Sequence, residues 1–564
     1  MSQRKHIIFS IAILFLLSAL IMLRQVISSA YFSCIIQDSF DYTSWAWQFV
    51  QALKEGIIYP RWLPLNFWGY GSPAFILYPP LAFYLVSFFD IFTHSVITAM
   101  NITKFVALFL SGVGMFFLIK EVYSEKIALL TAAFYVIFPY NTFEFYFVGT
   151  FASTVSFMWF SPIVLFTYRY IKHGSYINIA YAGLCYGGLI LTHLINAYMF
   201  TFVLLSFIIF MSITRKRPEN LFAIPLILVI GFLISAAYIL PILHDRRFIN
   251  LGFFIKDFVL DFHNFFIIPN MTTKFPEGHA WRAYYNVFAF YAFFFSVFIV
   301  LSLIQTMKLR RVKEMGSVYR VNKVFFGVAI FSIFLMFGIS TVIWETVPFF
   351  KYIQFPNRWL NVAAFAVVFL SAIIFWTVVT VYKTKQRQVI FITLLFLMCL
   401  LLDSKYVVSS CAFRKENFEA HQASNWNYEH LPTWVNAQEI GKNISQERVM
   451  MLNGEGKTKI IKWDSAERVI EITAQTPLTL RIRTFYFPGW KAYVDTGQTE
   501  IRTEEGTGAM LIAIPEGIHT LGMKFEDTPV RYYSKIISAG SFFIMVVLFF
   551  FRRRQTGAKE RKDE

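Results

Sequence analysis

Residues 359–382 read WLNVAAFAVVFLSAIIFWTVVTVY, an apolar run without a charged side chain. A helix needs about 20 such residues to cross the hydrocarbon core of a bilayer. Comparable runs recur along the chain, and we expect spans near residues 7–29, 97–119, 127–143, 151–171, 176–193, 195–213, 219–243, 284–306, 324–343, 359–382, 389–406 and 533–551. The sequence therefore predicts a polytopic α-helical membrane protein of about 12 spans.

The composition supports this interpretation and excludes other classes of protein. Of the 564 residues, 57% are hydrophobic and 15% are charged, whereas soluble domains have about 25% charged residues. These values exclude a soluble enzyme, a disordered chain and a disulfide scaffold. The four cysteines lie far apart and show no metal-ligand spacing, so we predict no metal site.

The net charge of +17 is concentrated in the short loops that we expect on the cytoplasmic side. Short cytoplasmic loops characteristically retain Lys and Arg, so the charge indicates orientation and gives no support for nucleic-acid binding. It predicts a multi-pass protein with both termini in the cytoplasm. A further apolar stretch, 74–92, contains Pro79 and Pro80. With this orientation it must lie in the interface or re-enter the membrane.

Three parts are predicted from this topology. Residues 1–406 form the transmembrane domain, with a long external loop at 30–96. Residues 407–532 have a soluble composition, and period-two alternation at 478–484 and 509–514 predicts antiparallel strands. We expect an extracytoplasmic β-sandwich there, with a helical or irregular start around 414–440. Residues 533–564 form a final transmembrane helix and a basic cytoplasmic tail.

Two carboxylates, Asp38 and Asp41, follow the first predicted span. They share a face if the segment is helical, and a carboxylate at a bilayer boundary needs solvation, a partner or a function. The pair could act as a general base or bind a metal next to a lipid-borne substrate. Alternatively, one of them caps an interfacial helix over residues 42–53. Glu144, on the external side of its predicted span, is a further possible acid.

Residues 59–81 of the external loop are rich in aromatic residues, proline and glycine. An aromatic belt at the membrane surface explains this composition. The functional alternative is a lipid or sugar groove shaped by side chains such as Tyr78, with Arg61 meeting a phosphate.

Other polar residues lie where predicted spans meet the external side. His193 lines a substrate cavity or is hydrogen-bonded between helices. His244, Asp245 and Arg246 form a base and diphosphate site or a solvated loop flank. Arg358 binds a lipid phosphate or extends its charged group to the interface.

Short motifs follow one another along most of the chain. They are Asp38 with Asp41, 56–62, 69–73, 78–81, Pro139 and Tyr140 with Tyr146, Thr192 with His193, 354–358, 487–490 with Asp495, 515–519 and 527–529. A long first external loop with an early acidic residue, many spans and a C-terminal external domain resembles the GT-C superfamily of membrane glycosyltransferases that use polyprenyl-phosphate sugars. The motifs, in this order, resemble more closely a bacterial family of polytopic membrane proteins labelled "6-pyruvoyl-tetrahydropterin synthase-related", although nothing resembles a soluble pterin synthase or its zinc site.

One departure from the family pattern lies at residues 146–153. The family often has Tyr-x-Arg-Gly followed by a segment that ends in Glu, whereas this chain has Val148 in place of the Arg and Ser153 in place of the Glu. If those two side chains bind substrate in the family, the resemblance implies altered or lost activity here.

The resemblance implies transfer of a sugar from a polyprenyl-phosphate donor to an extracytoplasmic glycan or protein acceptor. No soluble nucleotide fingerprint is visible, which agrees with a lipid-linked donor. We expect no further cofactor, and leave the need for a divalent cation open. The alternative is a non-catalytic transporter or assembly factor for envelope lipid or polysaccharide, which the replacements at Val148 and Ser153 favour.

The same resemblance gives the candidate residues their roles. In an inverting mechanism a carboxylate removes the acceptor's proton, which would be the role of Asp38 or Asp41. Cations stabilise the charge that develops on the phosphate leaving group. Those cations would be Arg61, Arg358 and Arg246, with His193 in contact with the substrate.

Overall fold

The computed structural model describes residues 3–33, 36–250, 262–267, 279–309, 316–381, 384–409, 411–414, 430–436, 440 and 447–560. The chain forms two compact units. The first, here called the helical unit, comprises Met1–Ile36, Asn101–Gly231 and Val259–Ala412. The second, here called the mixed unit, comprises Gln37–Met100, Phe232–Phe258 and Phe413–Glu564.

The described residues include 10 helices that are long and apolar enough to cross a membrane. This confirms the prediction of a polytopic helical membrane protein. The helices are Arg4–Ile27, Val96–Val122, Glu125–Val148, Phe151–His173, Leu194–Arg215, Asn286–Lys308, Gly316–Phe334, Pro356–Thr380, Lys385–Val408 and Pro529–Phe549.

Two of the twelve expected spans take a different form. The stretch 176–193 forms α11 (Tyr176–Thr192), which has 17 residues. The stretch 219–243 is a pair of helices bent by 81° at a short break, Pro218–Ile234 and Ala236–Phe248. Counting that pair as one span gives up to 11. The stretch 74–92 forms α4 (Ala74–Leu77) and α5 (Leu81–Thr93), and α5, at about 20 Å, is shorter than a bilayer core.

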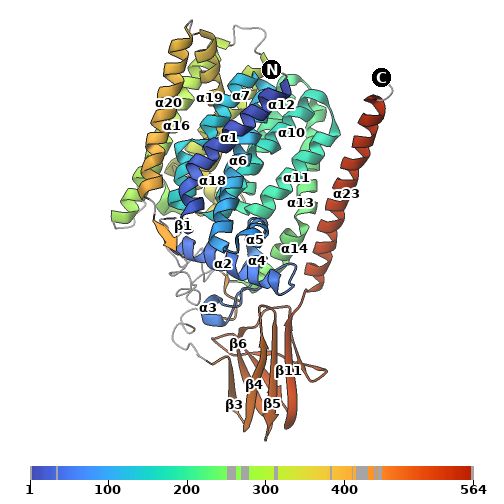
Figure 1. Ribbon diagram of the computed structural model, residues 1–564. Helices are drawn as coiled ribbons and strands as arrows, with labels where there is room; N and C mark the ends of the chain where they lie inside the picture. Colours follow the sequence, from blue (N-terminus) through green and yellow to red (C-terminus); the bar gives the residue numbers. More distant parts are fainter. Residues whose placement is uncertain are drawn as a thin grey trace. The chain divides into compact units, whose positions relative to one another are not determined.

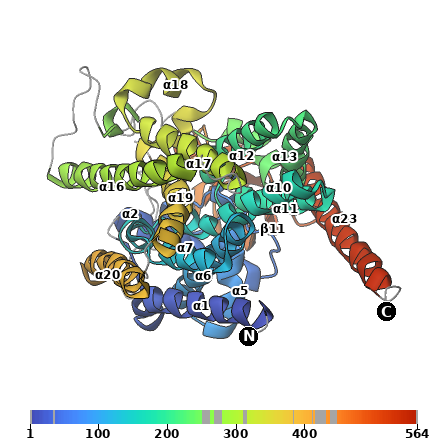
Figure 2. The same ribbon diagram turned by 90° about the horizontal axis from the view of Figure 1, so that it is seen from above.

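Helix α19 (Trp359–Val381) lies at the centre of the helical unit. Residues 359–373 are all buried, and the helix packs against α7 (Glu125–Val136), α16 (His279–Leu309) and α17 (Gly316–Phe334) (Figure 2). A helix that is apolar on every side must be surrounded by other helices or by lipid. The run that predicts the fold is therefore also one of its deeply buried helices.

The predicted β-sandwich is present as two antiparallel sheets in the mixed unit (Figure 1). One sheet has the strand order β3-β6-β10-β9 and the other β4-β5-β11-β7-β8. Buried side chains from both sheets, such as Ile470, Ile472, Leu480 and Ile482, form one core. Most of the expected irregular start at 414–440 lies outside the described residues. The strands are β3 Val449–Asn453, β4 Gly456–Trp463, β5 Glu467–Ala474, β6 Leu478–Phe485, β7 Trp490–Val494, β8 Gly497–Thr499, β9 Arg502–Thr503, β10 Ala509–Ile514 and β11 Gly517–Phe525.

Part of the aromatic loop belongs to this core. Trp62, Phe67 and Tyr70 are buried and pack in the same hydrophobic cluster as the two sheets. The Tyr70 ring stacks on Phe485 with centroids 5.0 Å apart, and the Tyr70 hydroxyl accepts a hydrogen bond from Arg481 at 2.8 Å. Both predictions for the loop, a membrane-surface belt and a lipid or sugar groove, are therefore wrong for these three residues, because their rings fill the core of the sandwich.

Candidate functional site

The acidic pair lies in helix α2 (Ile36–Lys54) of the mixed unit. Asp38 and Asp41 fall within its first two turns, so the spacing is helical and both residues lie inside the helix. The capping alternative is therefore wrong, since an N-cap residue precedes the first helical turn. Asp41 is 7% exposed, whereas the side chain of Asp38 lies outside the described residues. A carboxylate this well shielded on a helix that follows the first span is the most informative feature of the site.

Aromatic rings cluster on the helix turn that follows Asp41. The Tyr78 hydroxyl donates to the Tyr42 hydroxyl at 3.1 Å. The Trp45 ring lies 5.1 Å from the Tyr78 ring and 5.2 Å from the imidazole of His430. Burial lowers the pKa of His430 to about 3, so this imidazole is neutral at physiological pH. Tyr78, predicted to shape a groove, thus belongs to an uncharged aromatic cluster on α2.

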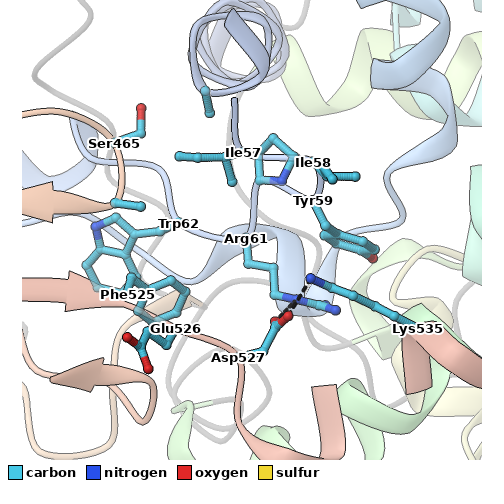
Figure 3. Close-up of a pocket in the computed structure, with 13 residues that line it drawn as sticks. Ile57, Ile58, Tyr59, Arg61, Trp62, Ser465, Phe525, Glu526, Asp527 and Lys535 are labelled. Atoms are coloured by element: carbon cyan, nitrogen blue, oxygen red, sulfur yellow. Dashed lines mark hydrogen bonds and ion pairs between the residues drawn. The ribbon is translucent and has the colours of Figure 1, made fainter. Parts of the chain in front are cut away.

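Arg61 lines a pocket of about 110 Å³ in the mixed unit (Figure 3). Its side chain is 3% exposed, and its guanidinium carbon lies 3.8 Å from the centre of the Tyr59 ring. Arg61 Nε is 3.6 Å from Asp527 Oδ1, and Lys535 also pairs with Asp527. Two cations therefore share the Asp527 carboxylate, and Glu526 also lines this pocket.

Pro241 explains why Arg61 finds a second acceptor in α14 (Ala236–Asp245). In a regular helix the N–H of residue 241 would donate to the carbonyl of Ala237, but proline has no N–H. The carbonyl accepts from Arg61 Nη1 and Nη2 at 3.4 Å and 3.3 Å instead. The position of Arg61 is thus fixed by a gap in the hydrogen bonding of α14.

The predicted group at 244–246 separates into two environments. Asp245 Oδ2 accepts from Arg531 Nε at 2.8 Å, and both side chains are fully buried. Asp245 Oδ1 is also 2.7 Å from His244 Nδ1, and Arg247 Nη2 is 2.9 Å from His244 Nε2. Arg246 is exposed. Asp245 therefore joins α14 to α23 (Pro529–Glu560) as one half of a buried ion pair.

A buried polar network occupies the helical unit. The Tyr140 hydroxyl lies 2.9 Å from Glu144 Oε1 and 2.8 Å from Asn361 Oδ1. Asn361 Nδ2 donates to Ser153 Oγ at 3.3 Å and to Asn196 Oδ1 at 3.4 Å. Buried polar groups that satisfy one another in this way have fixed positions. The network therefore holds a carboxylate, two amides and two hydroxyls in one arrangement.

His193 and Arg358 border this network. His193 Nδ1 accepts from the backbone N–H of Asn196 at 3.1 Å and caps α12 (Leu194–Arg215). Arg358 Nη1 donates to the Ile353 carbonyl at 2.8 Å, and its charge interacts with Glu144 and His193. The structure thus brings together residues that the sequence suggested one at a time.

Val148 and Ser153, the two residues expected to depart from the family pattern, lie beside and in this network. Ser153 Oγ accepts from Asn196 Nδ2 at 3.1 Å as well as from Asn361. Val148 ends a π-helical turn (Glu144–Val148), and its carbonyl accepts from Ser33 Oγ at 2.8 Å. Position 153 is therefore the meeting point of two amides, and a hydroxyl satisfies both of them.

Sequence reasoning missed Arg531 and Lys535, and it noted Asp527 within a motif without assigning it a role. A signal was present for Arg531, because a charged residue near the start of an apolar helix requires a partner or water. The sequence did not say which carboxylate would be that partner. Asp41, Arg61, Tyr78 and residues 244–246 belong to the mixed unit, whereas His193 and Arg358 belong to the helical unit. An enzyme of the predicted kind should bring Asp38 or Asp41, His193 and Arg358 around one cavity, and this grouping stays a prediction.

Comparisons with known proteins give structural neighbours of low sequence identity. The Archaeoglobus fulgidus oligosaccharyltransferase in the apo form aligns with 72% of this chain and 57% of its own at 14% identity and a TM-score of 0.43. The same enzyme tethered to an acceptor peptide containing the NVT sequon aligns with 75% of this chain and 59% of its own at 15% identity and a TM-score of 0.42. The chain thus spans less than two thirds of these proteins.

A search of curated proteins found no significant match to this chain. A family model described as "6-pyruvoyl-tetrahydropterin synthase related domain; membrane protein" matches residues 75–410. This match covers more than half of the chain and includes the polar network as well as most of the predicted spans. The chain belongs to the 6-pyruvoyl-tetrahydropterin synthase-related family of membrane proteins.

Proposed function

We propose that this protein is a membrane glycosyltransferase that transfers a sugar from a polyprenyl-phosphate carrier to an extracytoplasmic glycan or protein acceptor. The observation that carries the proposal is Asp41, a carboxylate that is 7% exposed on the helix that follows the first span. Its neighbours on α2, Tyr42 and Trp45, contribute to the aromatic cluster. A shielded carboxylate beside flat apolar rings suits a general base that meets a hydroxylated substrate.

The reaction assigned to Asp41 is a direct displacement. The carboxylate takes the proton from the acceptor's nucleophilic group while that group forms a bond to the anomeric carbon of the sugar. The bond between the anomeric carbon and the phosphate oxygen breaks, and polyprenyl phosphate leaves with the electron pair. The base is needed as the nucleophile attacks, and cations are needed as the phosphate leaves. Asp38 remains the second candidate for the base.

Arg61 and Lys535 are the candidate cations of the mixed unit, because they line one pocket and both pair with Asp527. A phosphate in this pocket would compete with Asp527 for the two cations. The exposed Arg246 is available to a diphosphate, and Arg358 is the corresponding cation of the helical unit. We assign His193 a positioning role, since its Nδ1 already accepts a backbone hydrogen bond.

We further propose that the protein lies in a bacterial cytoplasmic membrane with both termini in the cytoplasm. In this orientation α2 and the β-sandwich are extracytoplasmic. The Lys and Arg excess of the short loops supports this orientation. An extracytoplasmic site also agrees with a donor whose sugar is linked to a lipid.

A non-catalytic role in transport or assembly of envelope lipid or polysaccharide is the second candidate. One observation favours it: several candidate substrate ligands already bind protein groups. Asp245 pairs with Arg531, Arg61 binds the Ala237 carbonyl, and Ser153 stands where the family has a carboxylate. A family member that had lost catalytic activity would still use these side chains for structural contacts.

Mass spectrometry of lipid-linked and envelope sugars separates the two candidates. The strains are wild type, a deletion, and Asp38→Ala/Asp41→Ala with the protein level matched to wild type. A transferase predicts that one sugar disappears from an acceptor and that its polyprenyl carrier accumulates in both mutants. If the deletion changes the envelope but the double variant behaves as wild type, the acidic pair is structural and the second candidate is preferred.

A further inference from the structure

A groove of about 370 Å³ lies between three helices of the helical unit, α12, α17 and α19. These helices contact one another, and α12 and α17 run side by side (Figure 2). Most of the lining is apolar, with Phe202, Phe210, Val328 and Phe331 among its side chains. Between Lys323 and Phe331 the groove follows α17 for about 12 Å, at 1.5 Å per residue. Its shape and chemistry suit an extended hydrocarbon chain.

Gly327 opens the middle of this groove. A Cβ atom added at this position would meet no atom within 4 Å, so close helix packing does not require glycine here. Glycine inside a helix costs roughly 0.5–1 kcal/mol relative to alanine. Its presence in α17 therefore has no packing explanation within the protein, whereas a larger side chain would fill the groove.

Lys323 places a positive charge at one end of the groove. The side chain is exposed, and its Nζ lies 4.6 Å from the centre of the Tyr319 ring. Within the part of the chain that the structure describes, Lys323 forms no ion pair with a carboxylate. A cation inside an apolar helix is costly unless an anion or water reaches it. An anion that reaches the groove would therefore meet a lysine that no described carboxylate neutralises.

Two arginines extend this positive charge towards the helix ends. Arg320 lies one turn before Lys323 on α17, and Arg215 is the last residue of α12. Arg320 and Arg215 are close enough for their like charges to repel, and the Nε atoms of both are buried without a hydrogen-bond partner among the described residues. The carboxylate of Glu121 pairs with Arg169 and Lys172 instead.

We propose that this groove binds one acyl chain of an anionic phospholipid, whose phosphate pairs with Lys323, Arg320 and Arg215. Basic clusters between membrane helices bind anionic lipid headgroups, and the apolar lining takes the chain that such a headgroup carries. The proposed orientation places this end of the helices in the cytoplasmic leaflet, which contains anionic lipids. This site is separate from Asp41 and does not depend on the proposed glycosyl transfer.

Native mass spectrometry of the purified full-length protein tests the proposal. Dioleoylphosphatidylglycerol and dioleoylphosphatidylcholine are titrated separately, because they share acyl chains and differ in headgroup charge. The wild type is expected to retain the anionic lipid with higher affinity. Lys323→Gln should weaken that binding about fivefold, the contribution of one basic residue near an anionic surface. Gly327→Leu should reduce binding of the anionic lipid by filling the groove.

Matched variants control for charge and for folding. Lys308→Gln removes an exposed cation of a neighbouring helix, and Gly540→Leu fills open space in α23; neither should change lipid binding. Lys323→Arg should retain it.

Three results would overturn the proposal. One is equal affinity of the wild type for the two lipids, and another is equal effects of Lys323→Gln and Lys308→Gln. The third is a polyprenyl phosphate that displaces the phospholipid and needs the same residues, because the groove would then be a donor site.

Discussion

The buried pair of Asp245 and Arg531 gives a quantitative prediction about the mixed unit. Both side chains are fully buried, and Nε and Oδ2 lie 2.8 Å apart. Asp245→Leu leaves the guanidinium buried, and its Nη1 and Nη2 have no other hydrogen-bond partner among the described residues. Removing one partner of a buried ion pair costs about 3–5 kcal/mol. At roughly 2–4 °C per kcal/mol, Asp245→Leu should lower the Tm of this unit by about 6–20 °C.

The reverse substitution, Arg531→Met, should cost less. It leaves Asp245 with the His244 imidazole, whose Nδ1 lies 2.7 Å from Oδ1. The double variant Asp245→Leu/Arg531→Met should be more stable than Asp245→Leu alone, because no buried charge remains. Thermal unfolding in detergent, followed by tryptophan fluorescence, gives the Tm of the wild type, the two single variants and the double variant.

An exposed ion pair provides the control for this experiment. Arg502 pairs with Glu500 at 3.4 Å, and both side chains are more than 70% exposed. Arg502→Gln should therefore change stability by less than about 1 kcal/mol. If the effects of Asp245→Leu and Arg531→Met simply add in the double variant, the two residues are not coupled and the structural role of the pair is refuted.

Three further predictions concern a helix cap, a surface pair and the orientation of the chain. His193→Asn should keep the cap of α12 and the stability of the protein, whereas His193→Phe should lower the free energy of unfolding by about 1 kcal/mol. Equal thermal unfolding of the two variants would exclude the capping role. One hydrogen bond joins the side chains of His519 and Asp495. It raises the pKa of His519 and lowers the pKa of Asp495. The histidine contribution to stability is present below pH about 6.5 and the aspartate contribution above about 3.9. His519→Gln should therefore destabilise the sandwich more at pH 5 than at pH 8, and a larger loss at pH 8 would contradict this. Finally, in a background without Cys34 and Cys411, an impermeant thiol reagent should label Ile58→Cys in intact cells and Gln386→Cys only after permeabilisation; the opposite pattern would reverse the proposed orientation.

The membrane helices could be predicted from sequence because a single run of about 20 apolar residues is enough to define a span. The alternating pattern of β6 and β10 identified strands for a similar reason, since burial on one face leaves a period of two. Two spans were less regular. Helix α11 has only 17 residues, and the chain bends by 81° between α13 (Ala223–Ile234) and α14. Apolar composition alone predicts neither the short length of α11 nor the bend between α13 and α14.

The candidate site was predictable residue by residue but not as an arrangement. The partners Asp245 and Arg531 are 286 residues apart in sequence, and Tyr140 and Asn361 are 221 apart. No local pattern indicates such pairs, because they arise only from helix packing. The aromatic residues of the first loop show the same limit: Trp62 and Tyr70 have the composition of a membrane-surface belt, yet they fill the core of the sandwich.

The central claim is that Asp41 acts as the base of a glycosyl transfer, and one measurement tests it most directly. The deletion strain is complemented with Asp41→Asn or with the control Glu500→Gln, at protein levels equal to wild type. Mass spectrometry then gives the ratio of carrier-linked sugar to acceptor-linked sugar. We expect Asp41→Asn to raise this ratio as far as the deletion does, and Glu500→Gln to leave it at the wild-type value. A wild-type ratio in Asp41→Asn would contradict the catalytic role of Asp41.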